Sequence, residues 1–78
     1  MTATVLTIDD DDMIRSLFSD ILEEEGYEVL SAATGAEGEA LLRQKPVDII
    51  LLDLRLPDVD GLAILRKVKQ QDLNVHVI

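Results

Sequence analysis

One short apolar run constrains the fold of this chain more than any other feature: it extends from Ile49 to Leu52, and Asp53 follows it directly. An apolar run of this length with β-branched residues is typical of a strand buried on both faces, as in a parallel sheet. Pro57 and Gly61 mark a turn region after it. Ligands of open α/β sheets bind beyond the carboxyl ends of the strands, so Asp53 is expected at the mouth of a site. The alternative is that Asp53 only caps a loop.

The rest of the chain alternates between strand and helix patterns. Apolar residues between 13 and 22 share one helical face, and Gly26 suits the left-handed position that ends a helix. Thr34 and Glu37 fit a capping box, in which each side chain bonds the other residue's backbone N–H, and Pro46 ends that helix. Helical crossovers between consecutive strands imply a parallel sheet with right-handed connections. The predicted strands are 4–8, 27–31, 48–53 and 75–78, and the predicted helices are about 13–25, about 36–43 and one that begins at 61.

Composition excludes several classes of function. The 78 residues include 16 acidic and seven basic side chains, a net charge of −9, so the domain repels phosphate backbones and is not expected to bind nucleic acid. Only Phe18 and Tyr27 are aromatic, too few for base stacking. The lack of cysteine excludes disulfides and thiolate metal sites and fits a reducing cytosol. No apolar run reaches the roughly 20 residues of a membrane span. A soluble cytoplasmic protein of one small domain is therefore expected.

Carboxylates gather at the ends of two predicted strands. Asp9 to Asp12 follow the first strand, and Asp53 follows the third. If these strands are neighbours, their acidic groups meet at one edge of the sheet, where they must take up protons or bind a hard cation. Mg²⁺ suits such a site, whereas the ligand pattern of a calcium-binding loop is not present. Asp11 and Asp12 are expected to cap the following helix, which leaves Asp9 and Asp10 as the site candidates.

These residues resemble a known family. Asp9 and Asp10 follow a strand, Arg15 lies six residues after Asp9, and Asp53 belongs to the segment Leu-Leu-Asp-Leu-Arg-Leu-Pro-Asp-Val-Asp-Gly. In type and spacing they are similar to the receiver domain of two-component response regulators, and the resemblance covers the whole chain. It implies an α/β fold, a flavodoxin-like doubly wound parallel sheet with strand order 2-1-3-4.

The resemblance also implies a mechanism. Asp53 would be the phospho-acceptor and would take a phosphoryl group from a histidine of a sensor kinase or phosphotransfer protein. Mg²⁺ would be held by Asp10, Asp53 and the backbone carbonyl of Arg55, with Asp9 reaching the ion through water. Catalysis would consist mostly of positioning and charge neutralisation. The expected role is a signalling phospho-acceptor rather than a turnover enzyme, with an output domain in the parent protein.

Part of the family pattern lies outside these residues. Receiver domains have five strands and five helices, with a Ser or Thr after the fourth strand and a Lys after the fifth, and the sequence stops at Ile78, before either. The expectation is that residues 1–78 are the N-terminal part of a receiver domain, truncated after the start of the fourth strand and impaired in phosphorylation and switching. Lys67 and Lys69 lie on the third predicted helix and are not expected to substitute. The strand at 75–78 would be an exposed apolar edge, so self-association is expected, including by exchange of elements.

Two rival functions remain open. A phosphatase or phosphotransferase of the haloacid-dehalogenase type also uses an aspartate at a strand end with Mg²⁺, but Arg55 stands where that family's motif has its second aspartate. A protein-interaction module with a vestigial acidic pocket fits the same residues, and magnesium-dependent stabilisation would distinguish a working site from it. His76 is the only histidine and lies in a terminal strand, where a structural role is expected.

Overall fold

Strands and helices alternate along the chain in the computed structural model, which describes residues 2–53, 55–70 and 75–78. This is the predicted order, and each predicted boundary differs from the observed one by no more than one residue. None of the described helices is long and apolar enough to cross a bilayer. The elements are β1 (Thr4–Ile8), α1 (Asp12–Glu24), β2 (Glu28–Ala32), α2 (Gly35–Gln44), β3 (Ile49–Leu52), α3 (Gly61–Gln70) and β4 (His76–Val77).

The strands form one parallel sheet in the order β2-β1-β3-β4, as predicted. β1 lies inside the sheet, and all five of its residues are buried. Its last residue, Ile8, pairs with Ala32 of β2 and with Leu52 of β3. The hydrogen-bond ladder continues one step further, because the N–H of Asp9 donates to the carbonyl of Ala32 (3.1 Å) and the N–H of Asp53 donates to the carbonyl of Ile8 (2.9 Å). The tips of β1 and β3 therefore end side by side.

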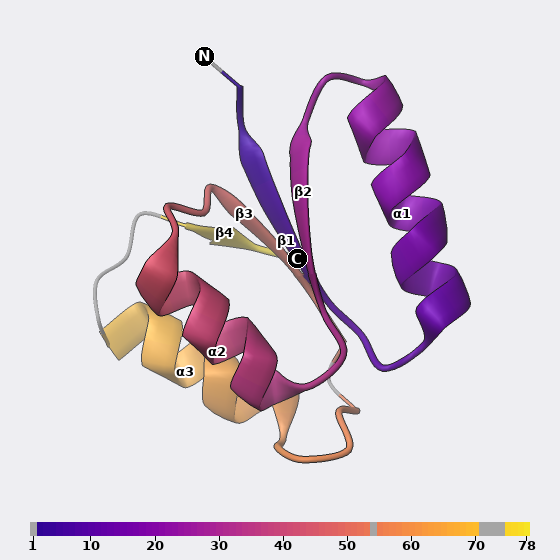
Figure 1. Cartoon of the computed structure of the whole chain (residues 1–78). Coiled ribbons are helices and arrows are strands. Elements are labelled where there is room, and N and C mark those ends of the chain that lie inside the picture. The colour runs from indigo at the N-terminus through magenta and orange to yellow at the C-terminus, as the bar shows by residue number, and fades with distance from the viewer. Residues whose placement is uncertain (1, 54, 71–74) are drawn as a thin grey trace.

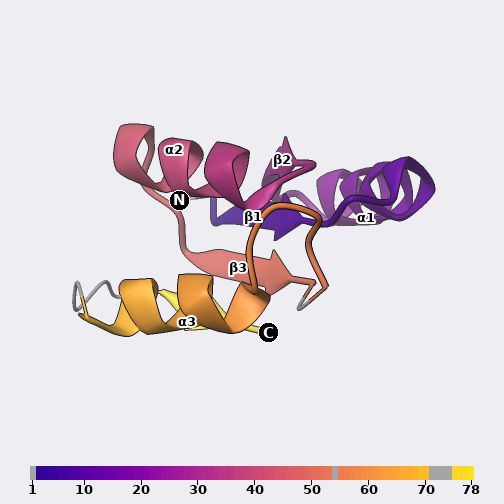
Figure 2. The same cartoon turned by 90° about the horizontal axis from the view of Figure 1, so that it is seen from below.

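Helices α2 and α3 cover one face of the sheet, and α1 lies on the other (Figures 1 and 2). The main core is built around Ile8, Ile50, Ile64 and Val68, which come from the sheet and from α3. Helix α2 reaches this core through Gly38, where an added Cβ would lie 2.5 Å from Cδ1 of Ile8. The missing side chain thus allows the helix backbone to approach β1 closely.

The face under α1 is much more open. Helix α1 has no buried residue, and its apolar side chains Met13, Leu17 and Ile21 are 82%, 57% and 49% exposed. The prediction that the third strand is buried on both faces is wrong for most of it: Ile50 is fully buried, but the other three residues of β3 are only half-buried. For Ile49 and Leu51, which share the face opposite Ile50, the reason is that α1 packs over β1 and β2. In the described part of the chain this leaves a cavity of about 630 Å³, which Leu51 lines.

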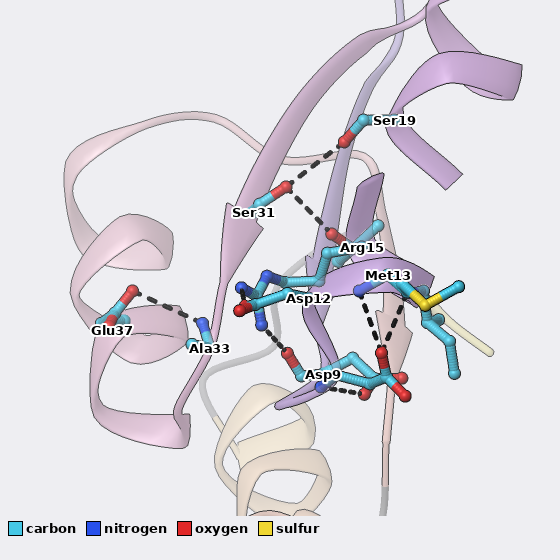
Figure 3. Close-up of polar contacts among 11 residues, drawn as sticks. Asp9, Asp12, Met13, Arg15, Ser19, Ser31, Ala33 and Glu37 are labelled. Carbon is cyan, nitrogen blue, oxygen red and sulfur yellow. Dashed lines mark hydrogen bonds and ion pairs between the residues drawn. The ribbon is translucent and has the colours of Figure 1, made fainter. Parts of the chain in front are cut away.

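The helix ends follow the predicted signals with one exception. Gly26 has a φ of 94°, as expected for the left-handed residue after α1. The hydroxyl of Thr34 accepts a hydrogen bond from the N–H of Glu37 (3.2 Å) and caps α2. The prediction that Glu37 bonds the N–H of Thr34 in return is wrong. The Glu37 carboxylate instead accepts a hydrogen bond from the N–H of Ala33 (3.4 Å) (Figure 3). The backbone at Thr34 is extended, as is usual for an N-cap residue, so the first half of the capping box is in place.

Candidate functional site

Three acidic side chains converge at the adjacent tips of β1 and β3. Asp9, Asp10 and Asp53 each offer a carboxylate oxygen, and these oxygens lie within 4.8 Å of one another. Asp9 and Asp53 are half-buried, and Asp10 is exposed. The ladder bonds beyond Ile8 align the two tips, so the convergence follows from the register of the sheet. The structure thus brings together three of the predicted site residues.

Hydrogen bonds fix the orientation of two of these carboxylates and the backbone of Asp9. Asp9 accepts from the N–H of Asp11 (2.9 Å), and the carboxylate of Asp53 accepts from the N–H of Arg55 (2.9 Å). The guanidinium of Arg15 donates to the backbone carbonyl of Asp9 (2.5 Å) (Figure 3). Each of these carboxylates therefore has one oxygen held by a backbone N–H, which sets the direction of the other.

The rest of the aspartate run belongs to helix α1, as predicted. Asp11 is the N-cap, and its carboxylate accepts from the N–H groups of Met13 (2.9 Å) and Ile14 (3.2 Å). Asp12 lies in the first turn and forms an ion pair with Arg15 (Figure 3). Carboxylates at these positions are favourable because the first N–H groups of a helix have no partner within it.

Arg55 contacts the carboxylate cluster through its backbone N–H. Its side chain is exposed, its N–H bonds Asp53, and it forms an isolated antiparallel bridge with Asp60 on the far side of the loop. The bridge closes the base of the loop between β3 and α3. The carbonyl of Arg55 therefore belongs to a constrained segment beside the carboxylate cluster.

Asp58 in the same loop is a residue that the sequence reasoning missed. Its carboxylate accepts from the N–H groups of Gly35 (2.8 Å) and Ala36 (2.9 Å) at the start of α2. These two hydrogen bonds, first that from Gly35 and then that from Ala36, hold the pKa of Asp58 below its usual value. The partners are 23 and 22 residues away, so no local pattern could have revealed the contact.

The donor set fits Mg²⁺. This ion takes oxygen ligands at about 2.0–2.1 Å in octahedral geometry, so opposite ligands are about 4 Å apart. Carboxylate oxygens separated by up to 4.8 Å can thus bind the ion partly directly and partly through water. The same carboxylates form one end of the cavity beside α1, whose remaining lining includes the apolar side chains of Ile14, Phe18 and Leu51.

Comparison with known proteins finds consistent similarity. The sequence model of the response regulator receiver domain matches residues 5–78. The transcriptional regulatory protein AruR of Pseudomonas aeruginosa is 43% identical over 74 residues, with 88% of this chain and 30% of that protein covered. Sporulation initiation phosphotransferase F of Bacillus subtilis is 35% identical over 78 residues, with 100% of this chain and 63% of that protein covered.

The fold is also similar to that of solved structures. A response regulator receiver domain protein (CheY-like) from Methanospirillum hungatei JF-1 matches with a TM-score of 0.94 and 35% identity, over 99% of this chain and 62% of that one. The chain thus spans between 30% and 63% of the length of these three proteins.

Proposed function

This chain belongs to the response regulator receiver domain family, and we propose that it is a phospho-acceptor module of two-component signalling, in which Asp53 receives a phosphoryl group with the help of Mg²⁺. The observation that carries the proposal is the convergence of Asp9, Asp10 and Asp53 within 4.8 Å. Such a group of negative charges favours a divalent cation. The similarity to a protein named as a phosphotransferase points to the same chemistry.

In this proposal Asp10, Asp53 and the carbonyl of Arg55 would hold Mg²⁺ directly, and Asp9 would reach it through water. The ion would neutralise charge on the phosphoryl oxygens. The N–H of Arg55 holds one oxygen of Asp53, which leaves the other to attack. That oxygen bonds to phosphorus as the bond between phosphorus and the donor histidine's nitrogen breaks. The electron pair of the broken bond stays on the imidazole, which takes up a proton from solvent.

We propose a sensor histidine kinase or phosphotransfer protein in the cytoplasm as the donor, and an output domain in the parent protein as the recipient of the signal. Residues 1–78 would form the N-terminal part of the receiver domain, in line with the 62% of the Methanospirillum chain that they cover. The Ser or Thr and the Lys that the family resemblance places beyond the fourth strand are not among these residues. The 78-residue stretch by itself is therefore expected to accept phosphate slowly and to switch poorly.

The test is incubation with Mg²⁺ and acetyl phosphate, followed by measurement of the intact mass. The native chain should gain one phosphoryl group, slowly, and Asp53→Asn should gain none. Asp20→Asn is the matched control, because Asp20 is an exposed aspartate on α1 outside the cluster. A gain that survives Asp53→Asn would refute Asp53 as the acceptor. A chain that is neither modified nor stabilised by Mg²⁺ would instead fit the interaction module.

We also propose that the exposed face of α1 associates with a second copy of the chain. Its apolar side chains are Met13, Ile14, Leu17, Phe18 and Ile21. At roughly 200 Å² for a fully exposed large side chain, these residues and the neighbouring Ile78 expose roughly 700 Å². A stable interface buries about 800 Å² on each partner, so this face could supply most of one.

Sedimentation over a range of concentrations tests this association, whether it occurs by simple contact or by exchange of elements. The native chain should form a dimer, and Leu17→Glu should shift it to the monomer. Leu62→Glu should not, because Leu62 is similarly exposed but lies on α3, on the opposite side of the sheet. A native chain that stays monomeric at high concentration would contradict the proposal.

A further inference from the structure

The carboxylate of Asp58 attaches the loop between β3 and α3 to the start of α2. One of its oxygens accepts from the N–H of Gly35 at 2.8 Å and the other from the N–H of Ala36 at 2.9 Å. These are the first two N–H groups of α2, which have no partner within the helix. Because Asp58 lies 22 and 23 residues away in the sequence, the contact is a tertiary connection and not a local cap.

Close packing supports these hydrogen bonds. A Cβ added to Gly35 would lie 2.2 Å from Cγ2 of Val59 and 3.3 Å from the Asp58 carboxylate. The loop thus lies directly against the backbone of α2, at a distance that only glycine permits. Two hydrogen bonds and one packing contact hold the loop and the first turn of α2 together.

The other end of the loop reaches the carboxylate cluster. The N–H of Arg55 donates to Asp53 (2.9 Å), and Arg55 pairs with Asp60 across the base of the loop. Asp60 also accepts from the N–H of Leu62 (3.0 Å) in the first turn of α3. The base of the loop is therefore fixed between β3 and α3, and Asp58 fixes its outer part. Arg55 and Asp58 are thus the inner and the outer attachment of one loop.

We propose that Asp58 is a positioning residue for the Asp53 site. By holding the loop on α2, it would keep the Arg55 carbonyl in place as a ligand for the metal, and it supports the hydrogen bond from the Arg55 N–H to Asp53. The inference rests on the proposed function, because it requires that Mg²⁺ binds beside Asp53. The same contacts couple the two places in the other direction, so Mg²⁺ that binds at the cluster changes the surroundings of the Gly35 and Ala36 amides.

Titration of the chain with Mg²⁺, followed by amide NMR, tests this connection. In the native chain the amide signals of Arg55, Gly35 and Ala36 should all shift with Mg²⁺. In Asp58→Ala the affinity for Mg²⁺ should fall about 10-fold, which is the usual effect of losing a residue that orients a metal ligand. The Gly35 and Ala36 amides should then no longer respond. Asp58→Asn keeps one acceptor oxygen, so an intermediate affinity is expected, and it serves as the second variant if Asp58→Ala does not fold.

Two control variants separate positioning from general damage to α2. Thr34→Ala removes the hydrogen bond to the N–H of Glu37, and Glu37→Gln removes a negative charge from the same helix end, while neither side chain bonds the loop in the described contacts. Both should retain the native affinity for Mg²⁺. Native affinity in Asp58→Ala, or an equal loss in Thr34→Ala, would overturn the inference and leave the proposed function standing. A native chain that does not respond to Mg²⁺ would overturn both.

Discussion

Replacement of Asp10 by Asn should change the stability of this domain in opposite directions with and without Mg²⁺. Asp10 is exposed and supplies one of three carboxylate oxygens within 4.8 Å of one another. At that distance each pair of unit charges repels by about 1 kcal/mol in water, and by more where water is partly excluded. Asp10 takes part in two of the three pairs, but Asp9 is its neighbour in sequence and repels it in the unfolded chain as well, so only the pair with Asp53 is created by folding. At low ionic strength, the free energy of unfolding of the metal-free variant should therefore exceed that of the native chain by about 1 kcal/mol.

Magnesium should reverse the relative stability of the native chain and Asp10→Asn. A ligand that binds only the folded state stabilises it by about 2.7 kcal/mol at a free concentration of 100 times its Kd. The variant has lost a direct ligand of the proposed site, so it should gain much less. Urea denaturation followed by circular dichroism, in EDTA and in saturating Mg²⁺ at equal ionic strength, measures both effects. The variant should be the more stable protein in EDTA, and the native chain should be the more stable one in Mg²⁺.

Asp20→Asn controls for the change of net charge. Asp20 is exposed on α1 and lies outside the cluster, so its replacement should leave the stabilisation by Mg²⁺ unchanged. The reasoning is refuted if Asp10→Asn is less stable than the native chain in EDTA. It is also refuted if the variant gains as much from Mg²⁺ as the native chain does, because the three carboxylates would then not act as one metal-binding group.

Two further predictions concern α2. Gly38→Ala should destabilise the fold by about 1 kcal/mol in thermal melts, since overpacking costs about 1–3 kcal/mol and the helix gains about 1 kcal/mol from alanine. The added Cβ would contact Cδ1 of the fully buried Ile8, so Ile8→Val should relieve the strain. Strictly additive effects of the two substitutions in the double variant would contradict this prediction. Because the pKa of Asp58 is lowered, the contribution of this carboxylate to stability is present above the unfolded-state pKa of about 4 and is lost as the pH falls through the folded-state value. The Gly35 and Ala36 amide signals should therefore titrate below pH 4. Titration at or above the usual aspartate value would contradict the two hydrogen bonds.

The sequence was sufficient to predict the order of elements, the order of strands and the meeting of Asp9 and Asp10 with Asp53. The order of elements follows from local patterns, whereas the order of strands was implied by the resemblance to receiver domains. The meeting of the aspartates follows once the first and third strands are neighbours, because parallel strands end at the same edge of a sheet. The burial of β3 could not be predicted, because it depends on which strands α1 covers, and α1 packs over β1 and β2. The contact of Asp58 with α2 was equally hidden, because it joins a loop to a helix end more than 20 residues away.

The two sides of the carboxylate cluster are held differently, and this decides where a change at the site spreads. On the β1 side, Asp9 is held by Arg15 of α1, and α1 has no buried residue. On the β3 side, Asp53 is held by Arg55, and the loop that begins there is bound through Asp58 to α2, which packs closely on the core. A shift of the Asp9 backbone toward α1 meets few packed neighbours. A shift of the Asp53 backbone toward α2 moves a segment that is fixed by hydrogen bonds and close contacts. Within the described part of the chain, the response to a metal or phosphoryl group at Asp53 is therefore expected on the α2 side of the sheet.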